Sequence, residues 1–516
     1  MDREVTISED VEAKPRTASR SAFTLMVGTL ASRITGFLRQ SLLTQLFSER
    51  ITDAFVVAQR IPGLFRELLA EGALTNSFIP VYKSLSKDEA KKLSAAVLGL
   101  LLVVNGVLLV VAYLAAPWIV ELFLSENGNI DKNLAVQLTQ IVFPFLMMIS
   151  LSAWAMGILN AEESFMAPAW APVALNIVTV ILMLVFPENA VMLAVGLVLG
   201  GLAQFVVQLP ALFRRRLVGL IRLWHPYLAG VLLLMIPSAF TTGGRQILNV
   251  ITTNLLDILP TGSATAFLNA DMFVGLASGL FGVSPALAFY SRLSDNAVHA
   301  PEKFNETLLG GLRLIAFLIL PAGFLLSVLA RPMIETLFNW MTVLGRTGTS
   351  ANIIDYSVAA LIPFGLTMLP MGLNTLLIRI FYIRKHVVTV VTITVFYLAL
   401  QGYLSYVFTP LYGIAGLSWA NVVGQWVQFA LLVVFVWRLE RFNVLELANQ
   451  IWRVTLAAAL AGLATYGVSY LPWTLSWWSS LAHTTLGVTV FALAYTLASY
   501  ALGIAEIKQL LQRLRR

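Results

Sequence analysis

About fourteen runs of predominantly apolar residues, each roughly 20 residues or longer, divide this chain. A run of that length can cross a hydrocarbon core of about 30 Å as an α-helix, which satisfies its backbone hydrogen bonds within one segment. Because 58% of the residues are hydrophobic and only 12% are charged, the composition excludes an ordinary soluble enzyme. The sequence therefore predicts an all-α, polytopic membrane protein of about 14 transmembrane helices.

A basic segment separates the apolar runs into two sets of six, each expected to form a six-helix lobe. Two further runs follow, and apart from Arg453 they carry Thr, Tyr, Trp and His rather than buried charge. Two pseudo-symmetric lobes plus two C-terminal helices indicate a repeat-built transporter, although the halves show no residue-level repeat. The expected parts are a polar tail at 1–20, the first lobe at 21–213, the linker at 214–227, the second lobe at 228–437, the extra helices at 438–504 and a basic tail at 505–516.

Lys and Arg residues gather in every second loop and in both tails. Cytoplasmic loops carry the excess of Lys and Arg in membrane proteins, so both termini are expected in the cytoplasm. This topology also accounts for the net charge of +7, and no nucleic-acid partner is expected. The N-terminal tail lacks the features of a signal peptide, so the first span is expected to act as its own insertion signal.

Two arginines lie inside the first apolar run, on either side of Gly36, with no acidic residue in the run to neutralise them: Arg33 and Arg39. A charge inside a bilayer is costly and usually faces a bundle interior or a watery cavity. The planar, permanently charged guanidinium matches phosphate oxygens, so these residues are candidate ligands for a phosphate group. Snorkelling of the side chains to a membrane interface is the alternative.

The second run carries more charge. At about 100° per residue, four side chains fall near one face of an unbroken helix: Asp53, Arg60, Glu67 and Glu71. We expect these four to form a pairing or gating network, whereas Arg66 points the other way and is a further candidate phosphate ligand. Pro62 and Gly63 interrupt the helix and make the phase beyond them uncertain.

The second lobe contributes Arg245, which follows two glycines, and Asp271, which lies deep in an apolar run. The two could pair across neighbouring helices, or Arg245 could add a positive group to the phosphate site while Asp271 joins the pairing network. Both alternatives stay open at this point.

The chain offers no catalytic constellation. It has no cysteine, and its four histidines stand apart without a metal-binding spacing. A Walker-type phosphate-binding loop is also missing. The sequence therefore predicts a transporter rather than an enzyme, with no metal, cofactor or nucleotide.

Several segments resemble the MurJ (MviN) lipid II flippases of the multidrug/oligosaccharidyl-lipid/polysaccharide exporter superfamily. They are SRITGFLRQ, TDAF and RIPGLFRELLAEGALTNSFIPVY near the N-terminus, then ILNAEESFMAPAWAPVALNI, LGGLAQFVVQLP and GLRLIAFLILP. The resemblance implies fourteen helices in two lobes around a cationic cavity with a lateral opening, and a groove for the polyprenyl tail formed with the last two helices. By motif match, the cavity arginines of the family fall on Arg33, Arg39 and Arg66, and the acidic residue of its second span falls on Asp53. Glu71 falls in the matching AEGA block.

The chain departs from the family at Met272, where an arginine usually follows the aspartate matched by Asp271. Arg245 is a possible substitute for that charge. The run 387–407 has no acidic residue, which makes a sodium site there doubtful.

The function implied is movement of undecaprenyl-pyrophosphate-linked peptidoglycan precursor (lipid II) to the outer leaflet of the bacterial cytoplasmic membrane by alternating access. Membrane potential or an ion gradient would supply the energy. Membrane lipids and cell-wall synthesis proteins are the other expected partners. Two alternatives are a flippase for another polyprenyl-pyrophosphate-linked oligosaccharide and a drug/cation antiporter, whose site should be net acidic.

Overall fold

The computed structural model describes residues 15–69, 73–346, 348–471, 473 and 476–514, and all the regular secondary structure in them is helical. The first half of the chain forms α1 (Pro15–Leu46), α2 (Glu49–Leu69), α3 (Ala73–Lys83), α4 (Lys87–Phe123), α5 (Lys132–Val142), α6 (Pro144–Ala161), α7 (Met166–Val185), α8 (Ala190–Val206) and α9 (Leu209–Arg214). The first helix therefore starts within the expected polar tail.

The second half begins after the linker. It consists of α10 (Leu228–Asp257), α11 (Ser263–Ser278), the π-helical turn η1 (Gly279–Val283), α12 (Ser284–His299), the 3₁₀ turn η2 (Pro301–Lys303), α13 (Phe304–Val328), α14 (Ala330–Phe338), the 3₁₀ turn η3 (Trp340–Leu344), α15 (Ala351–Ile383), α16 (Val387–Tyr412) and α17 (Ile414–Glu440). The last helices are α18 (Val444–Val468), α19 (Trp477–Ala501) and the short amphipathic α20 (Ala505–Leu514).

Eleven helical segments of the described chain are long and apolar enough to cross a membrane. The all-α, multi-pass prediction is thus confirmed. Three further expected spans correspond to α1, to α2 with α3, and to α10. These elements carry many of the polar and charged side chains described below, and the total of fourteen spans stays a prediction.

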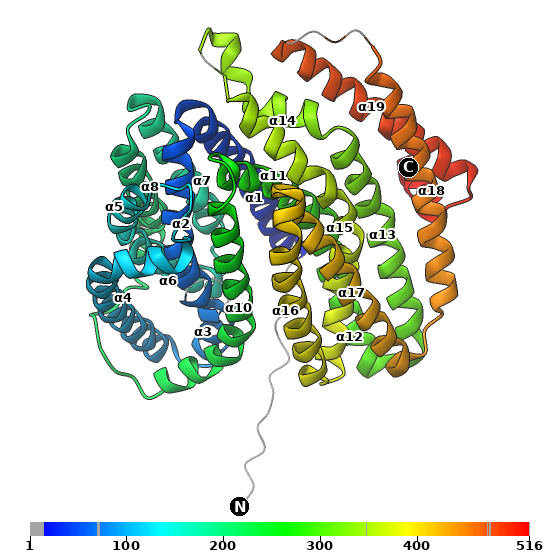
Figure 1. The fold of residues 1–516 in the computed structure, drawn as a ribbon. Helices are drawn as coiled ribbons and strands as arrows, with labels where there is room; N and C mark the ends of the chain where they lie inside the picture. The colour runs from blue at the N-terminus through cyan, green and yellow to red at the C-terminus, as the bar shows by residue number, and fades with distance from the viewer. Residues whose placement is uncertain (1–14, 70–72, 347, 472, 474–475, 515–516) are drawn as a thin grey trace, which may run out of the picture.

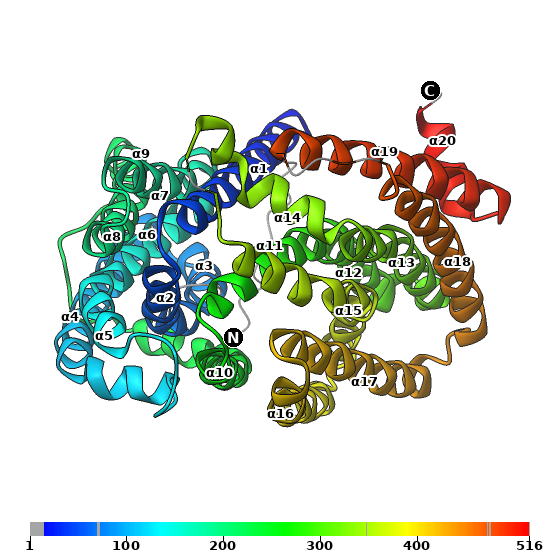
Figure 2. The ribbon, with the colours of Figure 1, turned by 45° about the horizontal axis from the view of Figure 1, so that its top comes forward.

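Two groups of helices lie side by side, with α1 and α11 passing between them (Figures 1 and 2). One group contains α2 to α8 and the other contains α12 to α19. Helix α10 follows the linker in sequence, yet it packs against α2, α3 and α4 as well as against α16. The linker divides the sequence just before α10, but in space α10 does not belong to the second group alone. It packs against helices of both groups.

The loops gather at two ends of the bundle. At the end that we call the basic end, His225 of the linker lies 3.1 Å from Glu89 of α4, and Arg384 binds Glu440 at 2.5 and 2.8 Å. At the other end, which we call the opposite end, Ser48 N–H donates to Glu188 at 3.1 Å. These contacts fix the loops of each group to one another.

Close helix contacts hold α1 against the first group. A side chain at Gly28 would place its Cβ 2.6 Å from the Cβ of Ala169 on α7, so only glycine fits at this crossing. On the same face, Asn176 Nδ2 donates to Thr35 Oγ1 at 3.1 Å and to Ser32 O at 3.3 Å. Helix α1 is thereby placed beside the cavity that holds the charged residues.

Candidate substrate cavity between the two halves

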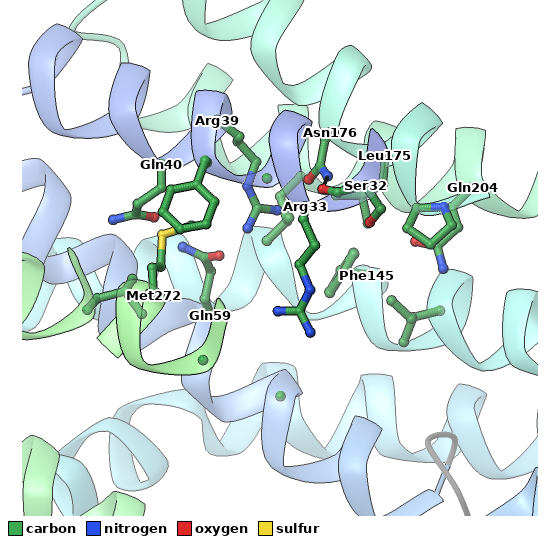
Figure 3. Close-up of a pocket in the computed structure, with 18 of the residues that line it drawn as sticks. Ser32, Arg33, Arg39, Gln40, Gln59, Phe145, Leu175, Asn176, Gln204 and Met272 are labelled. Atoms are coloured by element: carbon green, nitrogen blue, oxygen red, sulfur yellow. Dashed lines mark hydrogen bonds between the residues drawn. The ribbon is translucent and has the colours of Figure 1, made fainter. Parts of the chain in front are cut away.

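A cavity of about 980 Å³ lies between the two groups and is bordered by α1, α2, α6, α7, α8, α10 and α11 (Figure 3). Among the described residues, four charged side chains line it: Arg33, Arg39, Arg60 and Asp271. Amide side chains supply most of the other polar groups: Gln40, Gln59, Asn160, Asn176, Gln204, Gln246 and Asn249. The polar part of the lining thus consists mainly of neutral amides, and its charged groups are predominantly positive.

Arg33 and Arg39 both extend from α1 into this cavity, as the sequence predicts (Figure 3). Arg33 is exposed to the cavity, and its guanidinium has no hydrogen bond or ion pair within the described chain. One of its terminal nitrogens lies 3.4 Å from the point where a Cβ on Gly279 would be, so it reaches across to η1 of the other half. An unneutralised cation in this position favours an anionic ligand.

Arg60 and Asp271 face each other across the cavity from α2 and α11. They interact electrostatically without forming a direct salt bridge, and Arg60 also donates to Thr253 Oγ1 of α10. The structure thus brings Asp271 toward Arg60 rather than toward Arg245. Arg60 belongs to the cavity wall and is less free than Arg33 to bind a ligand.

Arg245 does not line the cavity, although Gln246 and Asn249 on the same helix do. Its electrostatic neighbour is Tyr397 of α16, on the outer side of α10. Met272, which stands where the family has arginine, does line the cavity and lies on the same side as Gln59 in Figure 3. In this conformation, neither Arg245 nor Met272 brings positive charge from the second half into the cavity.

Asp53 lies outside the cavity, buried at the junction between α2 and α11. Its carboxylate accepts hydrogen bonds from Gly262 N–H at 2.5 Å, from Thr265 N–H at 2.9 Å and from Thr265 Oγ1 at 2.6 Å. A carboxylate at a helix N-terminus satisfies backbone donors that have no partner within the helix and interacts favourably with the helix dipole. Asp53 and Arg60 therefore share a face of α2 but do not pair, because about 10 Å of helix separates them. Asp53 meets the start of α11, whereas Arg60 lies near Thr253 of α10 and Asp271 further along α11.

Three expected site residues cannot be placed. Glu71 lies outside the described residues, and the side chains of Arg66 and Glu67 are also outside the described part. Their roles as phosphate ligand and as members of a pairing network stay predictions.

A polar seal on the opposite-end side of the cavity was not predicted from the sequence. We define it by the hydrogen bonds that residues 40–49 of the first half make to the second half. Gln40 Nε2 and Thr44 Oγ1 donate to Asn269 Oδ1 at 2.9 and 3.1 Å. In the polar seal Ser41 Oγ also donates to Leu337 O and accepts from Trp340 Nε1–H. Met341 N–H donates to Gln45 Oε1, and Ser350 Oγ donates to Glu49.

Aromatic packing reinforces the polar seal. The rings of Phe37 and Phe273 lie edge to face with centroids 5.7 Å apart, and Phe273 meets Phe338 in the same way at 6.4 Å. The sequence signal was present in the polar residues of QSLLTQ at the end of α1, which interrupt an otherwise apolar run. Their partners could not be identified because they lie more than 200 residues away.

Comparisons with known proteins agree with this architecture. Residues 43–497 match the family model described as lipid II flippase MurJ. The chain is 34% identical over 431 residues to the lipid II flippase MurJ of Burkholderia cenocepacia, covering 80% of this chain and 82% of that protein. It is 32% identical over 429 residues to the probable lipid II flippase MurJ of Bdellovibrio bacteriovorus, covering 80% and 81%.

Solved structures place the fold among transporters. A lipid II flippase MurJ in an inward closed conformation superposes with a TM-score of 0.78 at 21% identity, covering 93% of this chain and 99% of that one. An inward-facing MATE family multidrug transporter of the MOP superfamily gives a TM-score of 0.67 at 17% identity, covering 82% and 99%. The family model spans most of the chain and the sequence relatives exceed 30% identity, so this chain belongs to the lipid II flippase MurJ family.

Proposed function

We propose that this protein moves lipid II, a peptidoglycan precursor linked to a polyprenyl pyrophosphate, between the leaflets of the bacterial cytoplasmic membrane. Family membership supports the substrate class. The cavity is assigned as the substrate site on one observation: the guanidinium of Arg33 is exposed inside it and has no carboxylate partner in the described chain. Such a group stabilises phosphate oxygens by charge-assisted, bidentate hydrogen bonds.

The charge of the cavity suits a pyrophosphate diester, which is dianionic. Its described lining carries three arginines and one aspartate. Arg33 and Arg39 bind the pyrophosphate in our proposal, while Arg60 and Asp271 balance each other on the opposite wall. The amides bind the glycan and peptide groups through neutral hydrogen bonds. A net acidic site, which a drug/cation antiporter would need, is not supported by this lining.

Alternating access follows from the position of the polar seal. Residues 40–49 close the cavity toward the opposite end, and we infer that this end is periplasmic because Lys and Arg residues concentrate at the other. In this conformation the substrate would enter from the cytoplasmic side, and both termini would be cytoplasmic. Opening the polar seal moves the end of α1, the helix that carries both cavity arginines.

Membrane potential can drive the return of the empty carrier. Moving one elementary charge across the membrane changes its energy by about 2.3 kcal/mol per 100 mV. When substrate neutralises the arginines, the loaded site carries little net charge. The empty cationic site is then the species drawn back toward the negative cytoplasmic side.

A second candidate is a flippase for a different polyprenyl-pyrophosphate-linked oligosaccharide. The specific observation that favours it is Met272, which leaves a thioether on the cavity wall where the family usually has an arginine. The pyrophosphate chemistry is the same in both cases, and only the glycan differs.

Complementation tests the proposal. In a strain depleted of its own lipid II flippase, the wild-type chain should restore growth, whereas Arg33→Ala and Arg39→Ala should each fail at equal membrane expression. Arg292→Ala is the matched control, because Arg292 stacks on Phe289 outside the cavity. Full rescue by both cavity variants would overturn the site. No rescue by the expressed wild type would favour the second candidate.

A further inference from the structure

The turn between α17 and α18 forms an apolar pocket that is separate from the substrate cavity. The pocket has a volume of about 440 Å³. It is lined mainly by Val433, Val434 and Trp437 of α17, by Phe442 of the turn, and by Val444 and Leu445 of α18. Both helices are long and apolar enough to cross the membrane, so their connecting turn lies at its surface.

Two arginines stand at the rim of this pocket without carboxylate partners in the described chain. The guanidinium of Arg441 lies 4.7 Å from the centre of the Trp437 ring, and that of Arg438 lies 5.8 Å from the centre of the Phe435 ring. Cation–π contacts orient both groups but leave their N–H donors available. The turn therefore presents two oriented cations beside an apolar hollow.

The carboxylates in this turn are already bound to other arginines. Glu440 accepts two hydrogen bonds from Arg384, at 2.5 and 2.8 Å, and Glu446 is paired with Arg313 of α13. Neither is paired with Arg438 or Arg441. Within the part of the chain that the structure describes, no carboxylate thus compensates the positive charge at the rim.

The backbone at the rim is held in an unusual conformation. Arg441 ends α17 with φ of +52°, in the left-handed region where glycine is the ordinary residue. Holding a non-glycine residue there costs roughly 1–2 kcal/mol. The fold thus fixes an arginine at a position where a glycine would be less strained.

We propose that this pocket binds one anionic phospholipid, with the headgroup phosphate on Arg438 and Arg441 and part of an acyl chain in the pocket. Leu445 is 83% exposed on the rim, which suits contact with lipid rather than water. Charge complementarity selects an anionic lipid, because a zwitterionic headgroup brings its own cation to the phosphate. The site does not depend on which lipid-linked substrate passes through the cavity.

Native mass spectrometry and thermal unfolding of the full chain test this site in two kinds of nanodisc, one of phosphatidylcholine and one containing phosphatidylglycerol. The wild type should retain phosphatidylglycerol and unfold at a higher temperature in its presence. The double variant R438Q/R441Q should bind that lipid on the order of tenfold more weakly, a loss of about 1.4 kcal/mol, because it removes both cationic partners of the headgroup phosphate. Its unfolding temperature in phosphatidylcholine should stay at the wild-type value.

The matched control is R292Q/R379Q, which removes two arginines that also stack on aromatic rings but lie away from the pocket. Equal retention of phosphatidylglycerol by this control and by R438Q/R441Q would overturn the proposal, as would equal retention of both lipids by the wild type.

Photocrosslinking gives an independent measurement that leaves the arginines intact. A photoreactive benzoylphenylalanine in place of the exposed Leu445 should capture an adduct with the mass of phosphatidylglycerol. Capture of a second copy of the chain, or of phosphatidylcholine in preference, would overturn the site.

Discussion

The side-chain amide of Gln40 donates to Asn269 Oδ1 across the two halves of the molecule, at 2.9 Å. Both residues are buried, and the same oxygen also accepts from Thr44. This small buried network is part of what holds α1 against α11 at the opposite end of the cavity. Its strength therefore contributes to the balance between closed and open states of that end.

We expect Asn269→Leu to open the polar seal. Removing the acceptor leaves the buried side-chain amide of Gln40 without its partner, whereas Thr44 Oγ1 can still donate to Gln40 O at 3.0 Å. The unpaired donor costs about 1–3 kcal/mol, and only the closed state bears this cost. The open population should rise about 5- to 150-fold. Because the chain has no cysteine, a single cysteine at Thr44 can report this change through labelling by a membrane-impermeant maleimide. Thr465→Val, which alters a buried threonine far from the polar seal, is the control, and equal labelling in both backgrounds would contradict the expectation.

Asp53→Ala should destabilise the junction between α2 and α11. The variant loses an acceptor for two backbone N–H groups and one hydroxyl, so we expect a loss of about 2–4 kcal/mol in the free energy of unfolding. Asp53→Asn keeps an acceptor oxygen and should lose less. Thermal unfolding in nanodiscs compares the two, and an alanine variant as stable as the wild type would argue against the helix-capping role.

Met272→Arg should add positive charge to the cavity wall. The new guanidinium would enter from α11, in the half that lacks cavity arginines in this conformation. We expect it to restore part of the growth lost in Arg33→Ala, because electrostatic attraction for the pyrophosphate depends on the total charge of the site. Complementation by the double variant measures the effect, with Met272→Lys as a test of charge without the planar fork. Failure of both double variants to grow better than Arg33→Ala would show that position matters more than total charge.

Asp131 provides a pH-dependent contact in the loop before α5. The backbone N–H of Leu134 and, to a lesser degree, the Arg50 guanidinium hold the pKa of this carboxyl below its usual range, against the effect of its partial burial. Because the pKa is lower in the folded state, the contribution is complete above the ordinary aspartate value and is lost as the pH falls through the folded value. Unfolding temperatures of the wild type and Asp131→Asn should therefore differ at pH 7 and converge as the pH falls below the ordinary aspartate value. Parallel curves over this range would contradict the shift.

The sequence was sufficient to predict an all-helical, multi-pass chain and the position of Arg33 and Arg39 beside a cavity, whereas their role as phosphate ligands stays a prediction. Long apolar runs leave few alternatives to spanning helices, and Arg33 had no nearby carboxylate that could pair with it along the chain. The environment of Asp53 could not be predicted, because its partners on α11 lie more than 200 residues away. The phase of a single helix indicated that Asp53 and Arg60 share a face and lie about 10 Å apart along it, but not which groups each residue meets there.

Arg245 illustrates the same limit. Its neighbour Gln246, about 100° further round the helix, lines the cavity, whereas Arg245 itself interacts with Tyr397. A helical run with polar residues on several sides does not reveal which side meets the cavity. Only the packing of α10 between the two groups of helices decides this.

The π-helical turn at Gly279–Val283 joins α11 to α12, which form one long helix with different neighbours on either side of the turn. A π-turn inserts one residue into the helix and so offsets the side chains that follow by about 100°. Before the turn, α11 presents Asp271 and Met272 to the cavity; after it, α12 packs mainly on α13 and α15. The inserted residue changes the direction in which the side chains of α12 point relative to those of α11. Deleting one residue within η1 would therefore rotate α12 and turn its packing face away from α13 and α15.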